Sequence, residues 1–275
     1  VRYTGMIDSV CGNVPKIAVM HYTDLWISQK HIHQIEGIGS KFDVTFTRSK
    51  SLLEESKKLG IKNLSDFIVY SGVPYAESRR SADIAFSKDN PVKLLYVGKL
   101  IERKHLDYVI KAMGQLKREK NLMLTVVGEG PEKQRFEDIS KKYGIEGQVR
   151  FIGKLTREEV YRAMGDADIF IMPSVEETLG LVYLEAMMNG CLTVGTKGEG
   201  IDGIIEDGKN GFLVDPGSEK SVVETLQRIL RLPNDEIQQI SLAATETGKV
   251  FNEPDMAKRY LNRIRQLVRE KGGNA

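Results

Sequence analysis

Short apolar runs alternate with amphipathic stretches along almost the whole chain. The runs are mostly continuous, which is typical of strands covered on both faces in a parallel sheet. Between them, apolar residues recur at helical spacing, as at Leu106, Ile110, Met113 and Leu116. This alternation predicts right-handed βαβ units and a doubly wound α/β fold. The expected strands are 16–22, 43–48, 66–71, 93–98, 123–128, 149–153, 169–174, 192–196 and 211–214.

A polar, charged stretch at 75–92 interrupts this pattern and is bracketed by prolines. Such a composition is typical of a linker between domains. We therefore divide the chain into a first part at 1–78, with room for three βα units, and a linker at 79–92. A second part at 93–250 holds six expected strands. The tail at 251–275 is expected to form a helix that begins near Pro254, where a helix tolerates proline.

The composition argues against several classes of protein. A net charge of +2 over 275 residues is too balanced to indicate nucleic-acid binding. No apolar run reaches the roughly 18 residues of a membrane span and no signal peptide opens the chain, so we expect a cytoplasmic protein. Cys11 and Cys191 lack metal-ligand spacing and are expected to be buried, reduced thiols. The basic tail could contact the inner face of a membrane, although a solvated helix face is the favoured explanation. Its cations are Arg259, Arg263, Arg265, Arg269 and Lys271.

Two loops after expected strands carry groups suited to a phosphorylated ligand. Gly98 ends a strand, Lys99 follows at once, and Lys104 comes where a helix begins. Cations beside a helix N-terminus can bind a diphosphate, because side-chain charge and free backbone N–H groups act together. The next strand ends in Gly128-x-Gly130, which permits close approach of the backbone. Ordinary surface lysines and a plain turn would also explain these loops.

The segment PSVEETLGLVYLEAMMNG at 173–190 is more informative. Glu177 is expected in a loop and Glu185 on the following helix, eight positions later. A carboxylate at Glu185 could accept hydrogen bonds from two vicinal hydroxyls. The amides of Leu181 and Val182, at the helix N-terminus, could bind an anion. Together these features predict a site for a ribose, a diphosphate and a sugar.

This segment resembles the E-x7-E signature of the retaining GT-B glycosyltransferases, in particular family four, the glycosyl transferases group 1 type. Five further motifs follow the family's order and spacing: VGKLIERKH, VGEGP, VRFIGKL, DIFIMPS and EDGKNGFLVDP. Upstream, DVTFTRSKSLLEESKKLG and IVYSGVP resemble the end of the family's N-terminal domain. The resemblance implies a complete C-terminal Rossmann-like domain at 93–250 and a partial, acceptor-side Rossmann-like domain at 1–78. It also implies N-terminal truncation, and a C-terminal helix at 251–275 that crosses back to the first domain.

The resemblance also implies roles for individual residues. Glu177 and His21 would act at the reaction centre, where Glu177 would contact hydroxyls of the transferred sugar. Glu185 would bind the ribose, and the loop at Lys154 and Leu155 would pass the base. The diphosphate would be bound by Lys99, Lys104 and the amides of Leu181 and Val182. Gly98, Gly128 and Gly180 would belong to the loops around the donor.

The chain departs from the family at three places. Lys99 stands where the family usually has arginine. The lysine keeps the positive charge but cannot form the bidentate hydrogen bonds of a guanidinium. His105 replaces a common glycine, and Thr178-Leu179 replace a frequent Gly-Phe pair, which would reshape the sugar pocket.

The expected reaction transfers a sugar with retention from a nucleoside diphosphate, with UDP-sugar favoured, to a saccharide or lipid-linked hydroxyl acceptor. Cell-surface polysaccharide or glycolipid synthesis is the expected setting. No His/Asp cluster in the sequence suggests a cation site, so we expect neither a metal nor another cofactor. Two alternatives remain: a nucleotide-sugar epimerase on a similar scaffold, and a non-catalytic nucleotide-sugar-binding module.

Overall fold

The computed structural model describes residues 15–21, 42–75, 80, 83–87, 90–119 and 121–270. Cys11 and Lys271 lie outside these residues. The chain divides into two compact units, one formed by Val1–Gly72 with Phe251–Ala275 and the other by Val73–Val250. Within the predicted linker, Ile84 is buried and the N–H of Phe86 donates to Oδ1 of Asn234 at 3.1 Å, so this part of the stretch packs on the second unit.

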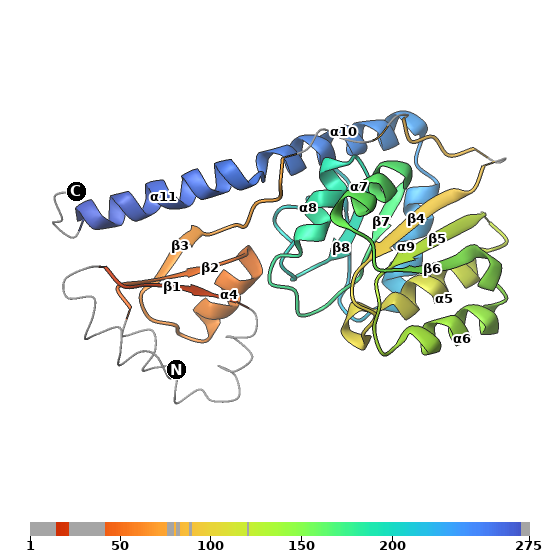
Figure 1. Ribbon diagram of the computed structural model, residues 1–275, viewed down its shortest axis with the longest axis horizontal. Helices are drawn as coiled ribbons and strands as arrows, with labels where there is room; N and C mark the ends of the chain where they lie inside the picture. Colours follow the sequence, from red (N-terminus) through yellow and green to blue (C-terminus); the bar gives the residue numbers. More distant parts are fainter. Residues whose placement is uncertain are drawn as a thin grey trace. The chain divides into compact units, whose positions relative to one another are not determined.

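The first unit contains a parallel sheet in the order β1-β2-β3, formed by Ile17–Met20, Val44–Thr47 and Leu64–Ile68. Helix α4 (Lys50–Lys58) joins β2 to β3. Ser49 caps its N-terminus, because the Ser49 side chain accepts the N–H of Leu52. Val44, Phe46 and Val69 pack with Leu267 of helix α11 (Glu253–Glu270) in one apolar cluster. Figure 1 shows α11 running along this sheet.

The second unit contains a six-stranded parallel sheet in the order β6-β5-β4-β7-β8-β9. Strand β4 is central, and it pairs with β5 on one side and with β7 on the other. The chain therefore reverses its direction of winding between β4 and β7, and ligands of open α/β sheets bind at such a switch point. The strands are Val92–Val97 (β4), Leu122–Val127 (β5), Val149–Gly153 (β6), Ile169–Ile171 (β7), Leu192–Thr196 (β8) and Phe212–Val214 (β9).

Helices cover both faces of this sheet (Figure 1). On one face α5 packs against α6 and α9, and on the other α8 packs against α7 and α10. Their bounds are Leu106–Leu116 (α5), Lys133–Tyr143 (α6), Arg157–Asp166 (α7), Leu181–Met188 (α8), Glu219–Leu230 (α9) and Asn234–Val250 (α10). Two 3₁₀ turns, η1 (Glu102–Lys104) and η2 (Glu146–Gln148), precede α5 and β6. This layered arrangement confirms the predicted doubly wound α/β fold.

Local sequence signals explain where these helices begin. Helix α7 starts with a capping box, in which Thr156 accepts the N–H of Glu159 while the Glu159 carboxylate accepts the N–H of Thr156 at 2.8 Å. Helix α6 ends at Gly144, which adopts the left-handed conformation (φ +62°) that glycine tolerates best.

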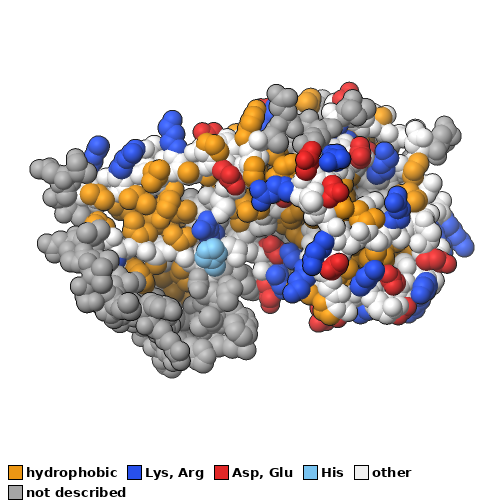
Figure 2. All heavy atoms as spheres, viewed as in Figure 1, with side chains coloured by type: hydrophobic (Ala, Val, Ile, Leu, Met, Phe, Trp, Pro, Cys, Tyr) orange, Lys and Arg blue, Asp and Glu red, His pale blue; other side chains and the backbone are white. Residues whose placement is uncertain are grey.

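The surface of the second unit carries both signs of charge. Figure 2 shows acidic and basic side chains interspersed on this face, with no large area of one sign. Among the helices of the described residues, none combines the length and the apolar character that crossing a membrane requires.

Candidate donor-binding site

A cavity of about 600 Å³ opens at the carboxyl ends of β4, β5 and β6. Because these strands are neighbours in a parallel sheet, the loops that follow them meet at one edge. The cavity brings together five residues that the sequence predicted separately: Gly98, Lys99, Gly128, Lys154 and Leu155. Val97, Val127 and Val160 supply apolar walls, and Glu129 and Gly130 complete the lining.

The glycines of the first two loops let two backbone segments pack directly on each other. Gly128 has φ +134°, and a Cβ there would overlap the carbonyl oxygen of Gly98. A Cβ at Gly130 would likewise overlap the carbonyl oxygen of Leu100, whose N–H donates to the carbonyl of Glu129 at 2.9 Å. The Gly-x-Gly motif therefore has a structural role in forming the cavity, whatever ligand enters.

The two predicted phosphate-binding lysines have different surroundings. Lys99 is exposed and lines the cavity. Lys104, at the end of η1, is only 11% exposed, and its Nζ lies 2.5 Å from Oε1 of Glu177. The same oxygen accepts hydrogen bonds from Arg103 Nη1 and Ser174 Oγ, each at 3.1 Å. The structure thus joins Lys104 to the first glutamate of the E-x7-E segment, a pairing that the sequence did not predict.

The backbone around Glu177 adopts an unusual conformation. Glu176 has φ +61°, in the left-handed region that residues other than glycine rarely occupy. The N–H of Glu177 donates to Oε2 of Glu199 at 2.8 Å. Burial raises the pKa of the Glu199 carboxyl, and the nearby charges of Glu177 and Glu176 add to this rise while backbone hydrogen bonds oppose it.

Gly180 (φ +76°) directly precedes helix α8, and a Cβ there would overlap the ring of Tyr183. Within the described residues, no protein acceptor is found for the N–H groups of Leu181 and Val182, as expected for the first turn of a helix. These two amides therefore remain available to an anion at the N-terminus of α8.

Glu185 lies one turn further along α8 and is partly buried. Its Oε1 accepts a hydrogen bond from the hydroxyl of Tyr161 at 3.1 Å. Burial raises the pKa of Glu185, while the Tyr161 hydrogen bond and the charge of Arg157 oppose the rise. Tyr161 fixes one carboxylate oxygen, which leaves the other for a ligand.

Sequence reasoning missed Arg103, Ser174, Tyr161 and Glu199. Arg103 and Ser174 stand beside residues that the motifs singled out, so adjacency alone could have suggested them. Tyr161 and Glu199 reach the site from α7 and from the loop after β8, and no local pattern marks them.

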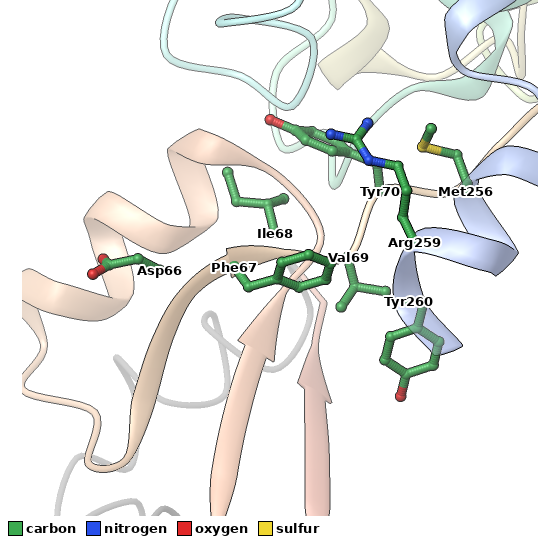
Figure 3. A pocket seen from close by; sticks show the side chains of 8 residues that line it. All are labelled: Asp66, Phe67, Ile68, Val69, Tyr70, Met256, Arg259 and Tyr260. Atoms are coloured by element: carbon green, nitrogen blue, oxygen red, sulfur yellow. The ribbon is translucent and has the colours of Figure 1, made fainter. Parts of the chain in front are cut away.

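The first unit carries His21 and a second cavity. His21 directly follows β1 and is exposed. A cavity of about 210 Å³ lies between β3 and α11, and Figure 3 shows the rings of Phe67 and Tyr260 and the guanidinium of Arg259 on its walls. One arginine of the basic tail thus belongs to a partly apolar pocket.

Comparisons with known proteins place the chain in a family. A family model for glycosyl transferases group 1 matches residues 78–268. An uncharacterized glycosyltransferase from Methanocaldococcus jannaschii is 31% identical over 152 residues, which cover 55% of this chain and 38% of the relative. The lipopolysaccharide core biosynthesis glycosyltransferase LpsE of Rhizobium meliloti is 30% identical over 142 residues, covering 52% and 40%. The chain thus spans less than half the length of these relatives.

The crystal structure of Anabaena HepE in complex with UDP superposes with a TM-score of 0.76 at 17% identity, over 95% of this chain and 75% of that one. Likeness at this identity concerns the fold, and it confirms the predicted GT-B architecture with Rossmann-like sheets. The family model covers well over half of the 275 residues. The chain therefore belongs to the glycosyl transferases group 1 family.

Proposed function

We propose that this chain binds the donor of a retaining glycosyltransferase, which transfers a sugar from a nucleoside diphosphate to a hydroxyl of a saccharide or lipid-linked acceptor. The observation that carries the proposal is the contact between Lys104 and Glu177 beside the α8 N-terminus. This contact places a cation, a carboxylate and free amides at the switch point of the sheet, next to the cavity formed by the preceding loops. A charged diphosphate and a hydroxyl-rich sugar need these groups close together.

The proposed pose follows the order of the loops. The base enters the cavity near Lys154 and Leu155, and the ribose hydroxyls donate to Glu185. The diphosphate lies between Lys99, Lys104 and the amides of Leu181 and Val182. Exposed Lys99 can move to meet the phosphates, whereas Lys104 must exchange part of its contact with Glu177 for them.

In the proposed reaction, the bond between the anomeric carbon and the diphosphate oxygen breaks as the acceptor oxygen attacks from the same face. Negative charge grows on the departing diphosphate, and Lys99, Lys104 and the α8 amides stabilise it without a metal. The distal phosphate takes the acceptor proton. Glu177 orients the sugar hydroxyls and shields positive charge on the ring.

We favour UDP over GDP and ADP as the nucleotide, because HepE has been crystallised with UDP and with UDP-glucose. Cell-surface polysaccharide or glycolipid synthesis remains the proposed setting, in agreement with the name of the relative LpsE. The family assignment favours the transferase over a nucleotide-sugar epimerase. A cytoplasmic enzyme whose basic tail contacts the inner face of a membrane is part of the same proposal.

Thermal shift with UDP, GDP, ADP and UMP tests the donor site. UDP should raise the melting temperature more than UMP, because the second phosphate meets Lys104 and the α8 amides, and more than GDP or ADP. Glu185→Gln should reduce the UDP shift, whereas Glu206→Gln, which alters an exposed carboxylate paired with Lys209, should leave it unchanged. A protein that responds to none of the four nucleotides would refute the proposed site.

Transfer itself requires a separate measurement. The wild-type chain should release UDP from a UDP-sugar faster when acceptor is added, and Glu177→Ala should abolish this release with little loss of UDP affinity. Saturable UDP binding without any release would instead support a binding module.

A further inference from the structure

The loop that carries Glu177 is held by two side chains that no motif assigns. It runs from Ser174 to Thr178, between β7 and α8, and includes the left-handed residue Glu176. A residue other than glycine rarely adopts this conformation, and it persists only where its surroundings impose it. The contacts that impose it here come from two other segments of the chain.

Arg103, in η1, holds the loop from one side. Its Nη1 donates to the carbonyl oxygens of Val175 at 3.0 Å and Glu176 at 3.2 Å, and to Oε1 of Glu177 at 3.1 Å. In return, the N–H of Val175 donates to the carbonyl of Arg103 at 2.9 Å. One guanidinium thus fixes both the backbone of the strained residue and the carboxylate that follows it.

Glu199, in the loop after β8, holds the same segment from the other side. Its carboxylate accepts the N–H of Glu177 at 2.8 Å and a hydrogen bond from the backbone of Glu176. The N–H of Gly200 donates to the carbonyl of Glu177 at 3.1 Å, and a Cβ at Gly200 would overlap the backbone of Leu179. The loop after β8 therefore lies in direct backbone contact with the Glu177 loop.

We propose that Arg103 and Glu199 are positioning residues that together fix the Glu177 carboxylate at the reaction centre. Arg103 donates to carbonyl groups of the loop and Glu199 accepts from its N–H groups. Together the two side chains provide partners for both kinds of backbone group. This inference rests on the proposed function, because it assigns the two residues to the transfer step. They act through Glu177, and the diphosphate is bound by other groups.

The test compares Arg103→Ala and Glu199→Ala with two controls, Arg162→Ala and Glu206→Ala. The controls remove an arginine and a glutamate whose ion pairs, with Glu158 and Lys209, are exposed. In Arg103→Ala and Glu199→Ala, the turnover number with a UDP-sugar should fall about 10- to 100-fold, because a small displacement of a reacting group has this effect. The dissociation constant of UDP should change less than about twofold, which is within 0.5 kcal/mol. The controls should match the wild type in both.

Conservative variants and hydrogen exchange separate positioning from general damage. Arg103→Lys and Glu199→Gln should recover part of the turnover, because a lysine can still donate to one oxygen and a glutamine oxygen can still accept one N–H. Backbone amides in 174–178 should exchange faster in the alanine variants than in the wild type, while those of β5 keep their protection.

Two results would overturn the inference. One is unchanged turnover and unchanged exchange in both alanine variants. The other is a loss of UDP affinity in Arg103→Ala as large as that in Lys104→Ala, which would make Arg103 a phosphate ligand. If the wild-type chain shows no transfer at all, the proposed function fails, and the exchange rates alone then decide whether these residues hold the loop.

Discussion

Replacing Lys104 by methionine should destabilise the second unit, because it leaves the Glu177 carboxylate without its nearest cation. The two side chains are 11% and 12% exposed, and their charged atoms lie 2.5 Å apart. With an effective dielectric constant of about 20, the gross attraction at this distance is about 7 kcal/mol. Removing two ions from water costs several kcal/mol each, so the net contribution of the pair is far smaller.

The loss on substitution exceeds this net contribution, because one charge remains behind. Arg103 and Ser174 still contact Glu177, which limits the effect. We expect Lys104→Met to lower the free energy of unfolding by about 2–3 kcal/mol. Glu177→Gln should cost about as much, because it leaves the buried Lys104 ammonium without its carboxylate. The loss of unfolding free energy in the double variant should be about 1–2 kcal/mol smaller than the sum of the two single losses.

Urea denaturation followed by circular dichroism at pH 7 measures this double-mutant cycle. The matched control is Lys133→Met with Glu137→Gln, an i,i+4 pair on α6 with 49% and 33% exposed side chains at 3.7 Å. Its coupling energy should stay below about 0.5 kcal/mol, as for other surface pairs. A coupling energy for Lys104 and Glu177 as small as that of the control would refute the argument. It would show that the two charges do not meet in solution.

Three further outcomes are expected. Burial raises the pKa of Glu185 above its ordinary 4.5, so between these two pKa values the folded protein holds a proton that the unfolded chain releases. The free energy of unfolding should therefore decline as the pH rises from 4.5 through the raised value. Urea titrations across this range should show that Glu185→Gln lacks this part of the decline. His105 has φ +48°, and its ring stacks on that of Tyr108 with centroids 4.5 Å apart. Both His105→Gly and His105→Ala lose the stack, but only alanine keeps the backbone strain, so thermal unfolding should show the glycine variant more stable by about 1 kcal/mol. Equal stability would argue against the left-handed backbone. Gly128→Ala should destabilise by about 3 kcal/mol because its Cβ meets the Gly98 carbonyl, whereas Gly147→Ala, with open space around it, should stay within about 0.5 kcal/mol.

The sequence was sufficient to predict which loops form the cavity. Apolar runs without alternation indicate a parallel sheet, and in such a sheet every strand ends at the same edge. Gly98, Gly128 and Lys154 could therefore be grouped before any distance was known, and the cavity contains all three. The pattern also located β4 to within one residue.

The contacts between side chains of different loops could not be predicted from the sequence. VGKLIERKH contains three cations, and no pattern indicates that Arg103 and Lys104 face Glu177 while Lys99 lines the cavity. Glu199 is one of many acidic residues, and its role depends on the course of a loop whose path no periodicity describes. Strand β3 was expected at 66–71 but is formed by Leu64–Ile68, and its pairing with β2 shifts register between Thr45 and Thr47, an irregularity that no sequence pattern indicates.

The pairing of β4 with β7 has a consequence for how the protein folds. It joins Leu94 to Ile169 and thereby brings Lys104 to Glu177, 73 positions away in the chain. Contacts between such distant residues slow folding, because closing the intervening loop costs conformational entropy before the contact is gained. The proposed nucleotide affinity should therefore appear only when these central strands have come together, and during refolding UDP binding would report the pairing of β4 with β7.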